Sequence, residues 1–279
     1  MHDGWDIIDR LIDFALEEDI GSGDITTRVT VDPDLTGKAV LIAREEAVLA
    51  GLDVFKRVFR KVDPGTKFDD NFMDGDILSA HQVVSTIHGS ILSILKAERT
   101  ALNFLQRMSG IATMTHRYVE KVMEFDVKIL DTRKTAPGLR WFDKYAVRVG
   151  GGTNHRFGLF DGVLIKDNHI AAAGSVEQAV KKAKSMVPHT LKVEVEVEDI
   201  EGVKQAVDAG ADIIMLDNMS VETMRQAVQV VSGRAIIEAS GGVNLDTVAD
   251  VASTGVNFIS VGALTHSPAA VDFSLDISS

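Results

Sequence analysis

Residues 128–170 read KILDTRKTAPGLRWFDKYAVRVGGGTNHRFGLFDGVLIKDNHI, and this stretch decides the fold because two β-rich runs flank a helical pattern. The first run ends at Leu130. Apolar residues spaced by three and four then predict a helix that has Pro137 near its first turn and ends at Gly150-Gly151-Gly152. A second buried strand is predicted at 162–165. Strand, helix, strand in this order predicts two parallel strands joined by a helical crossover.

The same alternation continues toward the C-terminus. Strands are predicted near residues 127, 162, 191, 212, 235 and 257, and helices near 138, 175, 199, 220 and 244. Residues such as Ser175, Ser220 and Asn244 are suited to cap the later helices. We therefore predict an α/β fold: an incomplete, open α/β barrel of about six or seven parallel strands that forms the catalytic domain, residues 110–267.

Residues 1–109 mix helices and strands without strict alternation, which is typical of an α+β domain. We predict an N-terminal α+β sandwich domain with helices at 4–18, 52–62 and 90–107, strands at 38–47 and 76–88, and a turn-rich connection at 20–27. The boundary is placed near Ser109-Gly110, where a second helix is predicted to start and run to about Glu124. The C-terminal tail, 268–279, is expected to pack with this domain.

Composition narrows the class of protein. The chain has 279 residues, of which 45% are hydrophobic, enough for a sizeable core. It contains no cysteine, which excludes disulfides, thiolate metal sites and a cysteine nucleophile. The net charge of −12 argues against nucleic acid or a membrane as partner. No apolar run is long enough for a membrane span, and the N-terminus lacks a signal-peptide layout, so we expect a cytoplasmic protein.

A basic cluster stands out against this acidic background. Between Asp131 and His169 there are seven Lys and Arg residues against four Asp. Those at helical spacing are interpreted as a solvated helix face: Arg140, Lys144 and Arg148. The others lie at predicted strand ends and in a Gly-rich turn: Arg133, Lys134, Arg156 and Lys166. Because active sites of α/β barrels lie at strand ends, these four predict a site for an anionic small molecule.

Acidic residues follow the neighbouring strands. In the run 191–197, Glu194 and Glu196 alternate with valines and are therefore expected to face the barrel interior. Asp217 ends the next strand at the same rim. Glu196 and Asp217 could hold Mg²⁺, largely through substrate and water. The alternative interpretation is an internal salt bridge to Lys134 or Lys166.

Glycines end the last two predicted strands, at Ser240-Gly241-Gly242 and at Gly262-Ala263. Backbone N–H groups can approach an anion closely at such positions, and barrels often bind phosphate at these two loops. Together, the residues predict a site for a phosphorylated substrate, a divalent metal and an acidic co-substrate.

Several motifs, in this order along the chain, resemble one family. They are Glu18-Asp19, Gly23 to Thr27, Glu98 to Asn103, Asp131 to Thr135, Gly150 to Arg156, Leu164 to His169, Glu194 to Glu196, Leu216 to Asn218, Glu238 to Gly242 and Gly262 to His266. The sequence is similar to quinolinate phosphoribosyltransferases, also called carboxylating nicotinate-nucleotide pyrophosphorylases. The resemblance covers nearly the whole chain.

The resemblance implies a reaction and a set of residues. The family joins quinolinate to phosphoribosyl pyrophosphate and yields nicotinate mononucleotide, pyrophosphate and CO₂ for NAD synthesis, with Mg²⁺ as cofactor. By resemblance, the quinolinate site would comprise Arg99, Thr132, Arg133, His155, Arg156 and Lys166. The phosphoribosyl pyrophosphate site would comprise Lys134, Asn168, Glu196, Asp217, Ser240, Gly241, Gly242, Gly262 and His266. The catalytic residues would be Lys134, Lys166, Glu196 and Asp217. Arg99 would act in trans, in a homodimer or higher homo-oligomer.

Three other functions are weighed. A related phosphoribosyltransferase paralogue acting on another acidic ring would share the fold and most site residues. A Schiff-base aldolase is a second possibility, because Lys166 lies at the end of a barrel strand. A non-enzymatic, anion-binding regulatory protein would leave several of the converging polar strand ends without a purpose.

Overall fold

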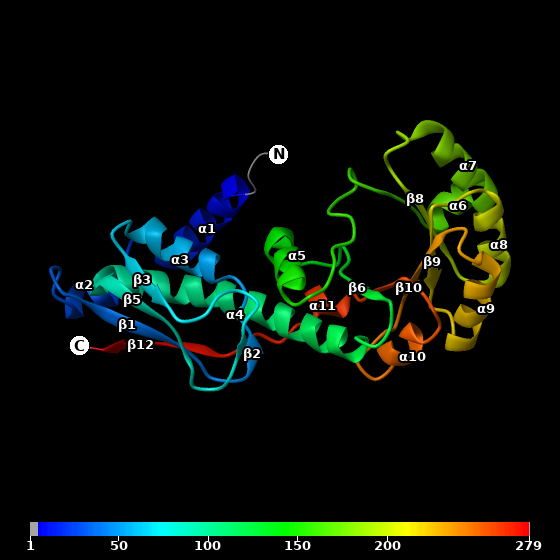
Figure 1. Ribbon diagram of the computed structural model, residues 1–279. Coiled ribbons are helices and arrows are strands. Elements are labelled where there is room, and N and C mark those ends of the chain that lie inside the picture. Colours follow the sequence, from blue (N-terminus) through cyan, green and yellow to red (C-terminus); the bar gives the residue numbers. More distant parts are fainter. Residues whose placement is uncertain (1–4, 279) are drawn as a thin grey trace. The chain divides into compact units, whose positions relative to one another are not determined.

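The structure is a computed structural model that describes residues 5–278, so that Gly4, the first residue of the first predicted helix, lies outside it (Figure 1). The chain divides into two compact units. Unit 1 takes in the chain up to Met114, residues 136–150 and the segment from Ser267 onward. Unit 2 comprises residues 115–135 and 151–266.

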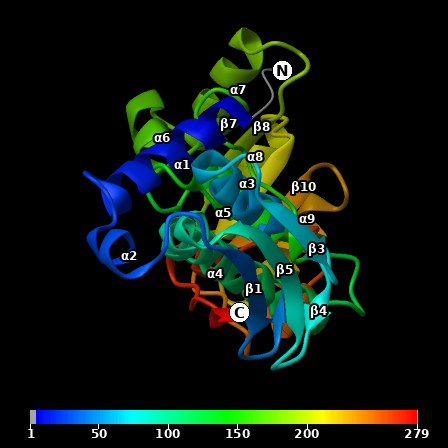
Figure 2. The ribbon, with the colours of Figure 1, turned by 90° about the vertical axis from the view of Figure 1, so that its left-hand side faces the viewer.

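Unit 1 is built on a four-stranded antiparallel sheet of order β12-β1-β5-β3, and Figure 2 shows β1, β5 and β3 side by side. Its strands are β1 (Thr36–Ala43), β3 (Lys67–Asp70), β5 (Val83–Ser90) and β12 (Phe273–Ser278), with a separate pair β2 (Ala47–Val48) and β4 (Ile77–Leu78). Its helices are α1 (Trp5–Ile20), α2 (Ile25–Thr30), α3 (Leu52–Val62), α5 (Arg140–Val149) and most of α4 (Ile91–Lys121). The prediction of an N-terminal α+β domain is confirmed.

The long helix α4 is continuous from Ile91 to Lys121, so the predicted break near Ser109-Gly110 is wrong. Both residues serve close packing in unit 1. The Ser109 hydroxyl accepts a hydrogen bond from the Ala50 N–H at 3.1 Å and donates to its carbonyl oxygen at 3.2 Å. A Cβ at Gly110 would collide with the backbone of Ala269. The glycine is therefore needed for space, although it weakens a helix locally.

Three further differences from the prediction are local, and turn chemistry explains the first two of them. Residues 25–30 form the short helix α2, whose N-cap Asp24 accepts a hydrogen bond from the Thr27 N–H at 2.9 Å. The helix expected to begin near Pro137 starts only at Arg140, because Gly138 has a φ of +80° that no helix accommodates. Residues 167–173 form another short helix, α6 (Asp167–Ala173).

Lys144 does not belong to a solvated helix face, because it is 1% exposed. Its neighbour Asp143 is fully buried and accepts two hydrogen bonds from Arg107, at 2.9 Å from Nε and 2.8 Å from Nη2. This forked ion pair is the arrangement that makes burial of a carboxylate tolerable. Part of the predicted solvated face of α5 is therefore buried.

Unit 2 contains six parallel strands in the order β6-β11-β10-β9-β8-β7, which confirms the predicted open barrel of about six or seven strands. The strands are β6 (Lys128–Leu130), β7 (Val163–Ile165), β8 (Val193–Val197), β9 (Ile213–Asp217), β10 (Ile236–Ser240) and β11 (Phe258–Ser260). The helices are α6, α7 (Val176–Met186), α8 (Ile200–Asp208), α9 (Val221–Val231), α10 (Val248–Ala252) and α11 (Ala263–His266).

Helices α7, α8 and α9 lie along the outer side of this sheet, as Figure 1 shows. Each follows its strand as a crossover, and Ser175, Asp199 and Ser220 cap their N-termini. The carboxyl ends of all six strands consequently meet at one rim. Within residues 5–278, no helix is long and apolar enough to cross a membrane.

Candidate active site

A cavity of about 640 Å³ opens at the carboxyl ends of the strands in unit 2. Its lining includes thirteen of the fifteen residues predicted for the site: Thr132, Arg133, Lys134, His155, Arg156, Lys166, Glu196, Asp217, Ser240, Gly241, Gly242, Gly262 and His266. They come from every strand end of the sheet and from the loop before β7. The alternation of parallel strands and helices therefore brings distant sequence motifs to one place.

Opposite charges meet on the wall of this cavity. Lys166 follows β7 and donates through Nζ to Oε2 of Glu196, which lies on β8. Asp217, the last residue of β9, accepts a hydrogen bond from the Asn218 side-chain amide at 2.9 Å. The predicted alternative of a salt bridge is thus realised for Glu196 with Lys166. Because Lys166 is an ion-paired ammonium, it is poorly suited to act as an amine nucleophile.

The glycine-rich strand ends form another part of the wall. Gly241 has a φ of +91°, and a Cβ there would collide with the side chain of Asn218. The alkyl chain of Lys134 and the ring of His266 pack against Gly262, at 3.1 and 3.3 Å from the position of a Cβ. Side chains larger than hydrogen would close the space at both positions. The backbone N–H groups there remain approachable by an anion.

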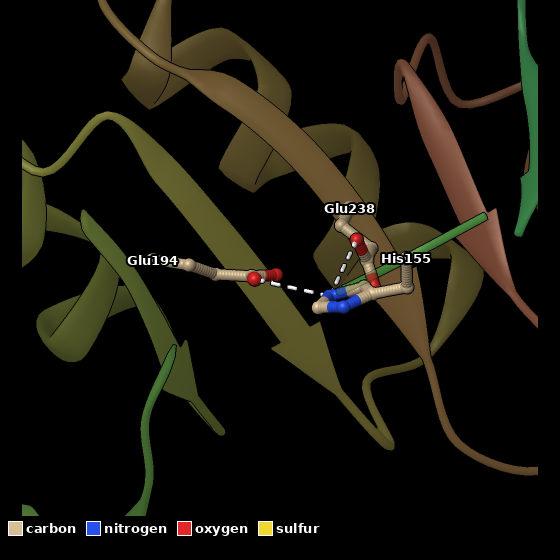
Figure 3. Close-up of side chains that lie close together, drawn as sticks. All are labelled: His155, Glu194 and Glu238. Atoms are coloured by element: carbon tan, nitrogen blue, oxygen red, sulfur yellow. Dashed lines mark ion pairs between the residues drawn. The ribbon is translucent and has the colours of Figure 1, made fainter. Parts of the chain in front are cut away.

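The inner side of the open barrel holds a cluster of His155, Glu194 and Glu238, in which one polar atom from each residue lies within 4.8 Å of the others (Figure 3). The Nε2 atom of His155 lies 3.0 Å from Glu194 Oε2 and 3.7 Å from Glu238 Oε2. Glu194 is 4% exposed and Glu238 is 2% exposed. His155 and Glu238 also line the cavity, so this cluster forms part of its floor.

Burial shifts the pKa values of two side chains in this part of the cavity, Glu238 and Arg156. Desolvation, and then the charge of Glu194, raise the pKa of Glu238 to about 8. Desolvation, and then the charge of Arg133, lower the pKa of the Arg156 guanidinium, whereas Glu194 opposes that effect. A buried carboxyl with a raised pKa therefore lines the same cavity as the lysines and arginines.

Two predicted residues lie outside the cavity lining. Asn168 is exposed in the first turn of α6. Arg99 is exposed on α4 and belongs to unit 1. Conversely, Glu238 was not predicted as a site residue. A signal for it exists, since a glutamate in the middle of the apolar run Ile236-Ile237-Glu238-Ala239 requires a buried partner.

The open parallel barrel, with arginines, lysines, two acidic strand ends and glycine-rich turns around one cavity, defines an enzyme for phosphorylated and carboxylated small molecules. Two family profiles identify it further. "Quinolinate phosphoribosyl transferase, N-terminal domain" matches residues 24–109, and "Quinolinate phosphoribosyl transferase, C-terminal domain" matches residues 111–276. The chain belongs to the quinolinate phosphoribosyltransferase family.

Individual relatives agree with this assignment. The chain is 43% identical over 268 residues to the "Probable nicotinate-nucleotide pyrophosphorylase [carboxylating]" of Bacillus subtilis, covering 96% of this chain and 92% of the relative. A protein of the same name from Methanothermobacter thermautotrophicus is 44% identical, with 98% of both chains covered. The crystal structure of NadC from Streptococcus pyogenes superposes with a TM-score of 0.95 at 46% identity, covering 100% of this chain and 99% of that one.

Proposed function

We propose that this protein transfers the phosphoribosyl group of phosphoribosyl pyrophosphate to the ring nitrogen of quinolinate and releases pyrophosphate and CO₂, yielding nicotinate mononucleotide for NAD synthesis. The observation that carries the proposal is the single cavity that combines four cationic side chains, two acidic strand ends and two glycine-rich strand ends. Those three groups match the dicarboxylate, the ribose and the phosphates of the two substrates.

The cations are proposed to bind the acid. Arg133 and Arg156 would act as forks for the carboxylates of quinolinate, together with Thr132, His155 and Lys166. Both ring nitrogens of His155 have protein partners, since Nδ1 accepts the Arg156 N–H at 2.7 Å and Nε2 faces the two glutamates. We therefore propose that His155 contributes its ring surface, and that the arginines supply most of the charge.

The phosphoribosyl pyrophosphate half would lie along the remaining wall. The backbone around Ser240, Gly241, Gly242 and Gly262 is proposed to bind the 5′-phosphate, with His266 beside it. Lys134 and Lys166 would neutralise the departing pyrophosphate. Asn168, which lies outside the cavity lining, would contact phosphoribosyl pyrophosphate from the rim of the cavity.

The chemistry then has two stages. When the bond between C1 and pyrophosphate breaks, positive charge develops on the ribose, and Glu196 and Asp217 would stabilise it. Once the ring nitrogen carries the ribose it is cationic. The adjacent carboxylate can then leave as CO₂, because the cationic ring stabilises the electron pair left on carbon, and that carbon finally takes up a proton.

Mg²⁺ is proposed as cofactor, and the residues present fit it. Glu196 and Asp217 offer the hard oxygen ligands that Mg²⁺ prefers. One oxygen of Glu196 is engaged by Lys166, which is compatible with an ion that is held mainly by substrate and water. When bound, Mg²⁺ would neutralise charge on the pyrophosphate leaving group.

A homodimer or higher homo-oligomer, with Arg99 acting in trans, is also proposed from the family resemblance. The exposure of Arg99 on α4 in unit 1 is compatible with a role toward a second copy of the chain. A cytoplasmic location is also proposed, because a chain without cysteine fits a reducing compartment.

Product analysis tests the reaction. The pure protein is incubated with quinolinate, phosphoribosyl pyrophosphate and Mg²⁺, and nicotinate is offered in parallel. Nicotinate mononucleotide and CO₂ from quinolinate, with no turnover of nicotinate, is the expected result. Turnover of nicotinate alone would instead support the paralogue, and trapping of a substrate on Lys166 by borohydride would support the Schiff-base aldolase.

A further inference from the structure

We propose that Asp131 is a positioning residue whose buried carboxylate holds Asn154 and His155 in place. Through them it fixes Arg156 at a set distance from Arg133. The inference deepens the proposed function and rests on it, because both arginines are proposed to bind the carboxylates of quinolinate. It assigns a purpose to a fully buried acidic side chain that the proposed mechanism leaves unused.

Backbone hydrogen bonds join the start of the segment 153–156 to the end of β6. Thr153 forms an isolated β-bridge with Leu130. The Thr153 N–H donates to the Ile129 carbonyl oxygen at 2.8 Å, and the Thr153 carbonyl oxygen accepts the Asp131 N–H at 3.2 Å. Because the bridge is isolated, this strand-like pairing ends at Thr153, just before the residues that line the cavity.

The side chain of Asp131 continues the connection where the backbone pairing ends. Its Oδ2 accepts a hydrogen bond from Asn154 Nδ2, and its Oδ1 accepts the backbone N–H of His155 at 2.9 Å. Hydrogen bonds to a carboxylate are stronger than those between neutral groups, and burial strengthens them further. One side chain therefore holds two consecutive residues of a segment that lies more than twenty positions further along the chain.

The position of His155 determines that of Arg156. The Arg156 backbone N–H donates to Nδ1 of His155 at 2.7 Å, and its Nη1 donates to the Gly162 carbonyl oxygen at 3.0 Å. Its Nε is buried without a hydrogen-bond partner. The placement of this guanidinium, which lines the cavity, consequently depends strongly on the backbone that Asp131 and His155 hold.

The second arginine belongs to the segment that Asp131 begins. Arg133 follows Asp131 by two positions and lines the same cavity. Two guanidinium groups repel each other, so the protein has to hold them at a separation that suits a ligand with two carboxylates on neighbouring ring atoms. Asp131 connects the two segments that carry these arginines, and this connection sets their separation.

An exchange of side chains tests the inference. Asp131→Asn keeps the shape of the side chain but places an amide donor against the amide of Asn154. It should raise the KM for quinolinate by about 10-fold or more and leave the KM for phosphoribosyl pyrophosphate within about 3-fold of wild type. In the double variant with Asn154→Asp, the new amide at 131 can donate to the new carboxylate at 154 and still accept the His155 N–H. The KM for quinolinate should then return to within about 3-fold of wild type.

The matched control is Asp212→Asn. Asp212 also accepts a backbone N–H, that of Val193 at 2.7 Å, and pairs with Lys184, but it precedes β9 at the end of the strand away from the cavity. This variant should lose stability and keep both KM values. If Asp131→Asn does not fold, Asn154→Ala, which removes one of the two hydrogen bonds, should still raise the KM for quinolinate by about 3-fold to 10-fold. An unchanged KM for quinolinate, equal rises in both KM values, or a folded double variant that shows no recovery would overturn the inference.

Hydrogen exchange provides a readout that does not depend on turnover. The peptide containing residues 153–158 should exchange its amide protons at least about 10-fold faster in Asp131→Asn, and at the wild-type rate in the double variant. Unchanged exchange in Asp131→Asn would overturn the inference even if the enzyme is active. If wild type does not turn over quinolinate while the exchange rates follow this pattern, the proposed function fails and the positioning role of Asp131 stands.

Discussion

Lys166 donates a hydrogen bond through Nζ to Oε2 of Glu196, and both side chains line the cavity of unit 2. The lysine is 44% exposed in its side chain and the glutamate 15%, so the pair is accessible to substrate and yet partly shielded from solvent. A cation that already has a carboxylate partner is held in position before the substrates bind.

Lys166→Met should therefore lower kcat/KM by at least about 100-fold, equivalent to about 2.7 kcal/mol of transition-state stabilisation. It removes a charge proposed to face both substrates and leaves Glu196 without its partner. Steady-state kinetics measure the loss. The matched control is Lys181→Met on α7, where the lysine is 61% exposed and forms an ion pair with Glu177 on the same helix. A kcat/KM of Lys166→Met within about 3-fold of wild type would contradict the assignment.

Gly241→Ala should weaken binding of phosphoribosyl pyrophosphate. The alanine would have to adopt a φ of +91°, and its Cβ would displace Asn218, whose side-chain amide donates a hydrogen bond to Asp217. We expect the KM for phosphoribosyl pyrophosphate to rise by about 10-fold or more.

The matched control for Gly241→Ala is Gly210→Ala. Gly210 has a φ of +78° but open space around its Cβ position. This variant should lose roughly 1 kcal/mol of stability from backbone strain and keep its KM values. If both variants change the KM equally, the effect arises from the backbone conformation alone, and the proposed phosphate site loses this support.

The stability of the protein should depend on pH through Glu238. Its pKa is raised from 4.5 to about 8, so between these values the folded chain keeps a proton that the unfolded chain has released. Rising pH therefore lowers the free energy of unfolding, by up to about 1.4 kcal/mol for each pH unit in this window. Glu238→Gln should lack this contribution.

Urea unfolding of wild type and Glu238→Gln at about pH 5.5 and about pH 7.5 measures the difference. The stability of wild type relative to the variant should fall as the pH rises. A constant difference across the two pH values would mean that Glu238 does not retain its proton in the folded chain.

Arg99 can be tested by mixing inactive subunits. If Arg99 acts in trans, Arg99→Ala and Lys166→Ala should each be inactive. An equal mixture of the two should recover about a quarter of wild-type activity, because about half of the dimers become hybrids and each hybrid has one intact site. Subunit exchange has to be demonstrated separately, for example with a mass-tagged subunit. No recovery after confirmed exchange would place Arg99 in the site of its own chain.

Much of the fold was predictable from the sequence because periodicity and packing agree there. Helix α3 was predicted at 52–62 and has those bounds, since Leu52, Phe55 and Phe59 recur on one buried face. The parallel sheet was predictable for a similar reason, as strand and helix patterns alternate at regular intervals. Inward-facing Glu194 and Glu196 follow from the strict alternation of β8.

The remaining differences arise from interactions that a local pattern does not contain. Gly110 resembles a helix end, but its role is to admit the backbone of Ala269. Lys144 shares its helical spacing with two charged residues and is nevertheless buried. Glu238 becomes recognisable only when the sheet register brings it toward Glu194 and His155. Sequence can indicate that such a residue needs a partner, but the fold supplies the partner.

The pairing of β12 with β1 has a consequence for the order in which the protein can fold during synthesis. Ala39 lies opposite Ile277, so one edge of the unit 1 sheet stays unpaired until the ribosome has made a strand that follows the whole of unit 2 in the chain. Until residues 273–278 emerge, the backbone N–H and C=O groups along that edge of β1 are open to pairing with other chains. The nascent protein is therefore expected to be most prone to aggregation while its catalytic unit is already complete, and to lose that hazard only when β12 has been made and pairs with β1.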